Sequence, residues 1–159
     1  MDSEGALHIR LAQADDDAFI LDLVGRFVDF PLPAWRKREV CFDGIHTDLD
    51  KVLSEQPPGS HVFVAEDDSG NRVGFLHLNT AIDYFTGAQN CHISDLAVAR
   101  QHDGRGIGRG LLAYAERWAK QHNCRYVTLN VFPDNTRGRE LYERAGYGTD
   151  MLRMLKVVR

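Results

Sequence analysis

Four glycines crowd one short stretch of the sequence and raise the question of what chemistry they serve. "RQHDGRGIGRGLLAYAERW", residues 100–118, places them within seven residues, directly before apolar residues at helical spacing. Each glycine inside a helix costs about 1 kcal/mol relative to alanine, so the run needs a compensating role. Glycines let a ligand approach the backbone, and the first N–H groups of a helix lack intrahelical partners. With Arg105 and Arg109 beside them, these amides predict a pyrophosphate-binding loop.

Two common glycine-rich phosphate loops do not fit these residues. A Walker loop needs Lys-Ser or Lys-Thr after its last glycine, whereas Gly110 is followed by two leucines. A dinucleotide-binding GxGxxG motif fails because Arg109 occupies the third glycine position after Gly104 and Gly106. A surface loop that only caps a helix stays open as the alternative.

The elements that must position this loop alternate between strands and helices. Apolar residues of period two predict strands at 7–12, 61–67, 72–85, 90–98, 125–132 and 150–158. Helical periodicity predicts a helix after Asp15–Asp17, a helix over 32–56 with a break near Gly44, one from Ile107 and a short one ending at Gly146. We therefore expect an α/β (α+β) fold with a mixed, mostly antiparallel sheet of about six to seven strands and helices on both faces.

Composition limits the class of protein. The chain has 159 residues, no low-complexity run and a formal charge of −4, which fits one domain over residues 1–159. The acidic balance argues against nucleic acid as a partner. The first residues lack the basic and apolar regions of a signal peptide, and no segment is apolar enough for a membrane span. The three cysteines, Cys41, Cys91 and Cys124, show no disulfide or zinc-binding pattern. We expect a cytoplasmic protein without a metal site.

Two motifs give the chain a family resemblance, specific over about residues 88–158. "LAVARQHDGRGIGRGLL" resembles the acyl-CoA signature Arg/Gln-x-x-Gly-x-Gly/Ala of the GNAT superfamily of N-acyltransferases, with Gly106 and Gly108 as its glycines and Asp103 at the Arg/Gln position. "NTRGRELYERAGY" resembles the family's Asn-x-x-Ala-Arg-x-Leu-Tyr-x-x-x-Gly-Phe, with Gly138 in place of alanine. A carboxylate at position 103 is unfavourable beside a pyrophosphate unless it points away.

The resemblance implies acetyl-CoA as co-substrate and a role for each part of the site. Residues 104–109 would hold the pyrophosphate, the backbone of residues 96–98 would pair with the pantetheine arm and stabilise the oxyanion, and Asn135 would contact the pantetheine. Tyr142 would hydrogen-bond the sulfur and act as general acid, with Gly138 leaving room beside its phenol. The predicted acyl-CoA contacts are Leu96, Ala97, Val98, Asp103, Gly104, Arg105, Gly106, Ile107, Gly108, Arg109, Asn135 and Tyr142.

The base that deprotonates the amine has several candidates. Asp95 is the predicted catalytic base, and Ser94 occupies the place where some similar enzymes carry glutamate. Period-two alternation puts these two side chains on opposite faces unless a bulge re-aims the chain. His77, His92 and a water chain are the alternatives.

The predicted function is acetyl transfer from acetyl-CoA to a primary amine in a ternary complex. The acceptor is a small cationic molecule, suggested by Asp43, Asp48, Asp50 and Asp83, or a peptide or protein amine. The alternative is an acyl-CoA-binding module that regulates a partner protein. The resemblance is also compatible with a homodimer.

Overall fold

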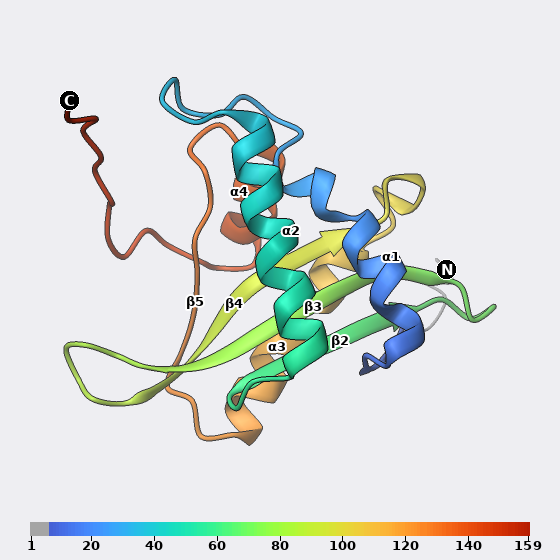
Figure 1. Cartoon of the computed structure of the whole chain (residues 1–159). Coiled ribbons are helices and arrows are strands. Elements are labelled where there is room, and N and C mark those ends of the chain that lie inside the picture. The colour runs from blue at the N-terminus through green and yellow to red at the C-terminus, as the bar shows by residue number, and fades with distance from the viewer. Residues whose placement is uncertain (1–6) are drawn as a thin grey trace.

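A computed structural model describes residues 7–159 and shows one mixed sheet with helices on both faces (Figure 1). Within these described residues, five strands lie in the order β1-β2-β3-β4-β5. They are antiparallel except for β4 and β5, which run parallel. Their bounds are β1 (His8–Leu11), β2 (Ser60–Glu66), β3 (Arg72–Ile82), β4 (Gln89–Val98) and β5 (Tyr126–Leu129).

The helices form a layer on each side of the sheet. They are α1 (Asp17–Asp22), α2 (Arg38–Glu55), α3 (Ile107–Gln121) and α4 (Thr136–Arg144), with short 3₁₀ turns η1 (Ala14–Asp16), η2 (Val24–Phe27) and η3 (Arg100–His102). Leu49 of α2 packs with Val64 and Phe75 on one face, whereas Leu111 of α3 packs with Leu76 on the other. Alternate residues of β3 thus enter different cores, as a strand covered on both faces requires. The predicted fold class is confirmed.

Three details of the predicted elements are wrong. Among residues 7–159 the sheet has five strands rather than six to seven, because residues 150–158 form no strand and stay exposed. α2 continues through Gly44, since its apolar side chains pack on the sheet and outweigh the cost of one glycine. The first predicted helix is divided into η1, α1 and η2. In the part of the chain that the structure describes, no helix combines the length and apolar character of a membrane span.

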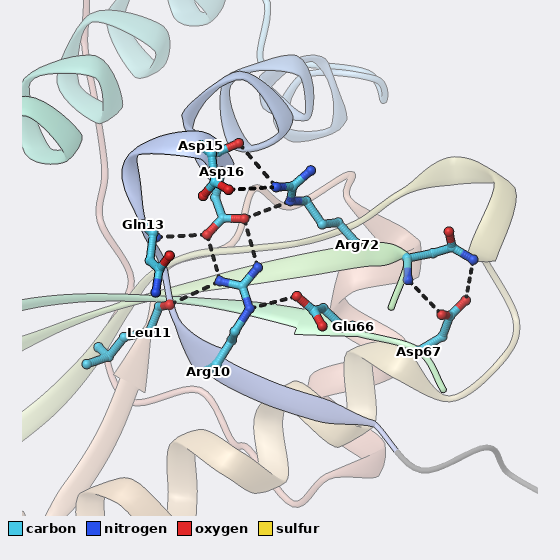
Figure 2. A network of polar contacts seen from close by, with 9 residues as sticks. Arg10, Leu11, Gln13, Asp15, Asp16, Glu66, Asp67 and Arg72 are labelled. Atoms are coloured by element: carbon cyan, nitrogen blue, oxygen red, sulfur yellow. Dashed lines mark hydrogen bonds and ion pairs between the residues drawn. The ribbon is translucent and has the colours of Figure 1, made fainter. Parts of the chain in front are cut away.

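A buried carboxylate ties the start of the chain to the sheet (Figure 2). Asp16 is fully buried and accepts hydrogen bonds from the Arg10 guanidinium at 2.7 and 2.9 Å, from Arg72 Nε at 2.7 Å and from the Gln13 amide at 2.8 Å. These donors, the Arg10 guanidinium foremost, hold the pKa of Asp16 far below its usual range despite burial. Arg10 also bonds Glu66 at 2.7 Å, so one network joins β1, η1, β2 and β3.

We expect Asp16→Asn to lower the free energy of unfolding by about 2–3 kcal/mol near neutral pH. The loss is smaller than for a fully buried pair, because both arginines are about one-third exposed. Folding depresses the pKa of Asp16, so its stabilisation is present above the unfolded pKa of about 3.9 and is lost as pH falls below that value. The asparagine variant should therefore lose less stability than the wild type between about pH 5 and 2.

Chemical denaturation of both proteins across this pH range measures the effect. Asp15→Asn is the matched control, because that side chain is exposed and lies 3.7 Å from Arg72, so we expect a change within about 0.5 kcal/mol. Equal losses for the two variants would contradict a special role for the buried carboxylate.

Candidate active site

A bulge in β4 decides how the candidate bases are arranged. His77 pairs with Asp95 and Leu78 pairs with Ile93, so Ser94 is an extra residue without a cross-strand partner. The sequence places Ser94 and Asp95 on opposite faces unless a bulge intervenes. This bulge brings both side chains to the same face of the sheet. Both side chains contact polar residues of β3 on the face that α1 and α2 cover.

These side chains form a continuous hydrogen-bond network. His77 Nδ1 lies 2.8 Å from Asp95 Oδ2, and His77 Nε2 lies 2.6 Å from the Ser60 hydroxyl. The Asn79 amide nitrogen lies 3.2 Å from His77 Nε2 and donates to Ser94 Oγ at 2.6 Å. A neutral imidazole satisfies this pattern when Nδ1–H donates to Asp95 and Nε2 accepts. His77 is buried, and its hydrogen bond holds Asp95, whose side chain stays 12% exposed.

His92 belongs to the same face but has a separate partner. It pairs with Asn79 across the strands, and its Nδ1 lies 2.8 Å from Thr128 Oγ1 of β5. Burial lowers the pKa of His92 below 6.5, which keeps the ring neutral near pH 7. Of the sequence candidates, Asp95, Ser94 and His77 thus share one network, and His92 lies beside it.

The glycine run forms a row of free backbone donors. Gly106 is the N-cap of α3, and Gly104 and Gly106 both have a φ of +77°, a left-handed conformation that favours glycine. Gly110 N–H donates to Gly106 O at 3.0 Å, but within residues 7–159 no hydrogen bond from the N–H groups of residues 104–109 is present. Alternating conformations with successive free amides at a helix N-terminus make an anion-binding concavity.

Beside this row, β4 extends beyond its parallel neighbour. β5 pairs with β4 only from Asn90 to Ile93, and β4 continues to Val98 with β3 alone. Leu96, Ala97 and Val98 therefore have a sheet edge that β5 does not cover. Val98 also packs close to Gly108, where an added Cβ would lie 3.9 Å from its side chain. The free edge and the free amides adjoin each other.

The Asp103 carboxylate forms ion pairs with two arginines. Its two carboxylate oxygens lie 3.0 and 3.1 Å from Arg26 Nη2, and Arg137 Nη1 donates to it at 2.8 Å. Two guanidinium groups thus compensate the charge that was expected to oppose a pyrophosphate. The same contacts connect η2, the glycine loop and α4. Asp103, which replaces the Arg or Gln of the family motif, thus has a structural role.

Tyr142 lies on α4, next to Leu141, which packs against Gly108. Burial raises the pKa of Tyr142 above 10, which keeps the phenol protonated. The side-chain hydrogen bonds of α4 among residues 7–159 do not involve its hydroxyl. The structure thus brings the second motif to the glycine run and leaves the hydroxyl free to donate.

Asn135 caps α4, since its Oδ1 accepts from Gly138 N–H at 3.0 Å. A Cβ at Gly138 would lie 2.6 Å from Asn135 Nδ2, so the cap occupies the space beside this glycine. The interpretation of Gly138 as room for a ligand is wrong, and close packing of the cap explains the glycine.

A depression of about 420 Å³, lined mainly by apolar surface, opens between η2 and α2. Glu39, Asp43 and Phe42 line it together with Asp29, whose carboxylate forms ion pairs with Arg26 and Arg100. Arg38 also lines it, but its guanidinium donates to the carbonyls of Val28 and Phe30. Of the other acidic residues noted in the sequence, Asp48 and Asp50 are exposed on α2, and Asp83 accepts from Thr86 in the β3–β4 turn.

Comparison with known proteins decides the family. A family model described as "Acetyltransferase (GNAT) family" matches residues 30–147. The chain belongs to the GNAT acetyltransferase family.

Curated relatives include a streptothricin acetyltransferase and an aminoglycoside acetyltransferase. Streptothricin acetyltransferase of Streptomyces lavendulae is 33% identical over 88 residues, which are 55% of this chain and 44% of that protein. The match thus spans less than half of that relative. Aminoglycoside N(6')-acetyltransferase type 1 of Stenotrophomonas maltophilia is 27% identical over 112 residues, covering 65% of this chain and 73% of that enzyme.

Solved structures show the same GNAT fold. Aminoglycoside N-acetyltransferase AAC(6')-Iy in complex with CoA has a TM-score of 0.69 and 18% identity, covering 98% of this chain and 96% of that one. At this identity the likeness concerns the fold.

Sequence reasoning missed four residues of the site. Ser60, Asn79, Arg26 and Arg137 belong to no motif, although residue 79 shares a strand face with His77 by period-two spacing. Arg26 lies 77 residues from Asp103 in the sequence, so no local sequence pattern predicts their contact.

Proposed function

We propose that this protein transfers an acetyl group from acetyl-CoA to a primary amine of a small cationic molecule. The observation that carries the proposal is the row of free amides at residues 104–109, next to the uncovered edge of β4. Backbone N–H groups and the positive end of α3 suit a diphosphate, and an open strand edge suits the amides of a pantetheine arm. The relatives are N-acetyltransferases, which agrees with this use.

Chain groups around the bulge supply the chemistry of acyl transfer. Backbone N–H groups within residues 96–98 polarise the thioester carbonyl and stabilise the oxyanion that forms when the amine attacks. Asp95 removes the proton from the ammonium, since its Oδ2 is held by His77 and its side chain stays partly exposed. The Tyr142 hydroxyl then donates a proton to the departing thiolate.

Two carboxylates beside the depression support a cationic acceptor. Glu39 and Asp43 lie on its wall as exposed carboxylates, and α2 lies on the sheet face that carries His77 and Asp95. Such walls attract an ammonium and fix its orientation. The aminoglycoside and streptothricin enzymes among the relatives are consistent with this acceptor class.

The direct test is release of free CoA from acetyl-CoA with a panel of aminoglycosides, polyamines, amino sugars and peptides. We expect turnover with at least one small polycation, above the rate of hydrolysis without amine. Saturable binding of acetyl-CoA with no turnover on any amine would contradict the proposal and support a regulatory acyl-CoA-binding module.

Replacement of Tyr142 by phenylalanine tests the general acid. We expect kcat to fall by about 10²-fold, with little change in the Kd of acetyl-CoA, because only the proton donor is lost. Tyr147→Phe is the matched control: its ring lies 6.2 Å from that of Tyr142, and its buried hydroxyl has no hydrogen-bond partner in the described chain. If both variants keep full activity, Tyr142 has no acid role.

Asp95→Asn tests the base while keeping a similar shape. At pH 7 we expect kcat/KM for the amine to fall by about 10²–10³-fold. The deficit should shrink as pH approaches the amine's ordinary pKa of about 10.4, since the acceptor then arrives deprotonated. Ser94→Ala serves as control with a small effect. A pH-independent deficit would mean that Asp95 acts through structure rather than proton transfer.

A further inference from the structure

Three side chains on neighbouring strands form a chain of hydroxyl, imidazole and carboxylate. The Ser60 hydroxyl of β2 lies 2.6 Å from His77 Nε2, and His77 Nδ1 on β3 lies 2.8 Å from Asp95 Oδ2 on β4. The hydroxyl and the carboxylate thus contact opposite nitrogens of one imidazole. In this order of contacts a histidine activates a serine and an aspartate orients the histidine.

Strand pairing fixes this arrangement. His77 lies opposite Asp95 on β4 and opposite Val62 on β2. Ser60 is two residues before Val62 and therefore on the same face of the sheet, as a diagonal neighbour of His77 within side-chain reach. β2, β3 and β4 lie side by side in the sheet (Figure 1). Because the backbone of a paired strand holds each group, the arrangement exists before any substrate binds.

The contacts favour the tautomer that such activation needs. The Asp95 carboxylate only accepts hydrogen bonds, so it binds the tautomer with the proton on His77 Nδ1. Nε2 is then the acceptor for the Ser60 O–H. His77 is only 1% exposed, whereas Ser60 is partly exposed. Solvent therefore reaches the residue that carries the hydroxyl, which leaves its oxygen open to an electrophile.

Asn79 places an amide donor beside the same hydroxyl. Its Nδ2 donates one hydrogen to Ser94 Oγ at 2.6 Å and lies 3.2 Å from His77 Nε2, the atom that Ser60 contacts. Asn79 is also the cross-strand partner of Ser60. The second hydrogen of this amide suits the oxyanion that forms when Ser60 attacks a carbonyl group.

We propose that Ser60 is the nucleophile of a second reaction, the hydrolysis of small carboxylic esters. Ser60 Oγ bonds to the carbonyl carbon of the ester while its proton passes to His77 Nε2. That proton goes to the alcohol oxygen as the ester C–O bond breaks, and the acyl group stays on Ser60 Oγ. Water then attacks the acyl carbon and gives a proton to Nε2. The same proton returns to Ser60 Oγ as the carboxylic acid leaves.

The substrate class follows from the groups around the hydroxyl. One amide donor stabilises the oxyanion less than two would, which favours esters over the less electrophilic amides. The reaction shares Asp95 with the proposed acetyl transfer, but no coenzyme takes part in it. The inference therefore does not depend on acyl-CoA binding.

Labelling with diisopropyl fluorophosphate tests the nucleophile on the full-length protein. An activated serine oxygen bonds to the phosphorus of this reagent and displaces fluoride, and mass spectrometry reports the number and position of the adducts. We expect one adduct, at Ser60, together with hydrolysis of p-nitrophenyl acetate. No adduct on the folded wild type would overturn the proposal, because the Ser60 hydroxyl then only satisfies the buried imidazole.

Two substitutions test how the serine is activated. Ser60→Ala should abolish the adduct and lower the hydrolysis of p-nitrophenyl acetate by about 10²-fold or more. Asp95→Asn should slow labelling by at least about 10²-fold, because an asparagine N–H that donates to Nδ1 shifts the imidazole proton to Nε2, which then no longer accepts from Ser60. Circular dichroism establishes that the variants are folded, and if Ser60→Ala does not fold, Asp95→Asn decides.

Ser54→Ala is the matched control. Its hydroxyl is exposed and donates to the Lys51 carbonyl at 3.1 Å, so the variant should be labelled like the wild type. An adduct that persists in folded Ser60→Ala, or labelling of folded Asp95→Asn at the wild-type rate, would overturn the proposal. Both assays contain no CoA, so their outcome is separate from that of the acetyl-transfer assay.

Discussion

The extra residue in β4 governs the arrangement of the polar site. Without the bulge at Ser94, strict alternation would send Ser94 and Asp95 to opposite faces, and only one could meet His77 and Asn79. With it, five polar side chains join in one hydrogen-bonded set on the α1 and α2 face. The bulge lies just beyond the last residue pair between β4 and β5, so the network and the free edge of β4 occur together.

Two arginines compensate the charge of the carboxylate that precedes the glycine loop. A carboxylate at residue 103 would repel a diphosphate, but Arg26 and Arg137 hold it and connect the loop to η2 and α4. The Asp16 network acts similarly at β1, where two arginines surround a buried carboxylate. In both places an acidic residue joins segments distant in sequence, which fixes the elements around the sheet.

The sequence predicted the features that depend on neighbouring residues, such as where helices and strands begin. Glycines before an apolar helical pattern marked the start of α3, and period-two alternation marked β2, β3 and β4. The bulge, the arginines around Asp103 and the Ser60 contact could not be predicted, because they depend on pairing between strands or on residues far apart. The pattern of residues 150–158 indicates a strand, but a strand forms only where a neighbouring strand shares its backbone hydrogen bonds, and these residues pair with no strand of the described chain.

Backbone amide NMR during titration with acetyl-CoA tests the central claim, that the free donors of residues 104–109 hold the diphosphate of the coenzyme. The account predicts that the largest shifts occur at these amides and at Leu96, Ala97 and Val98. Binding that leaves the amides of residues 104–109 unperturbed, or no binding at all, would contradict it.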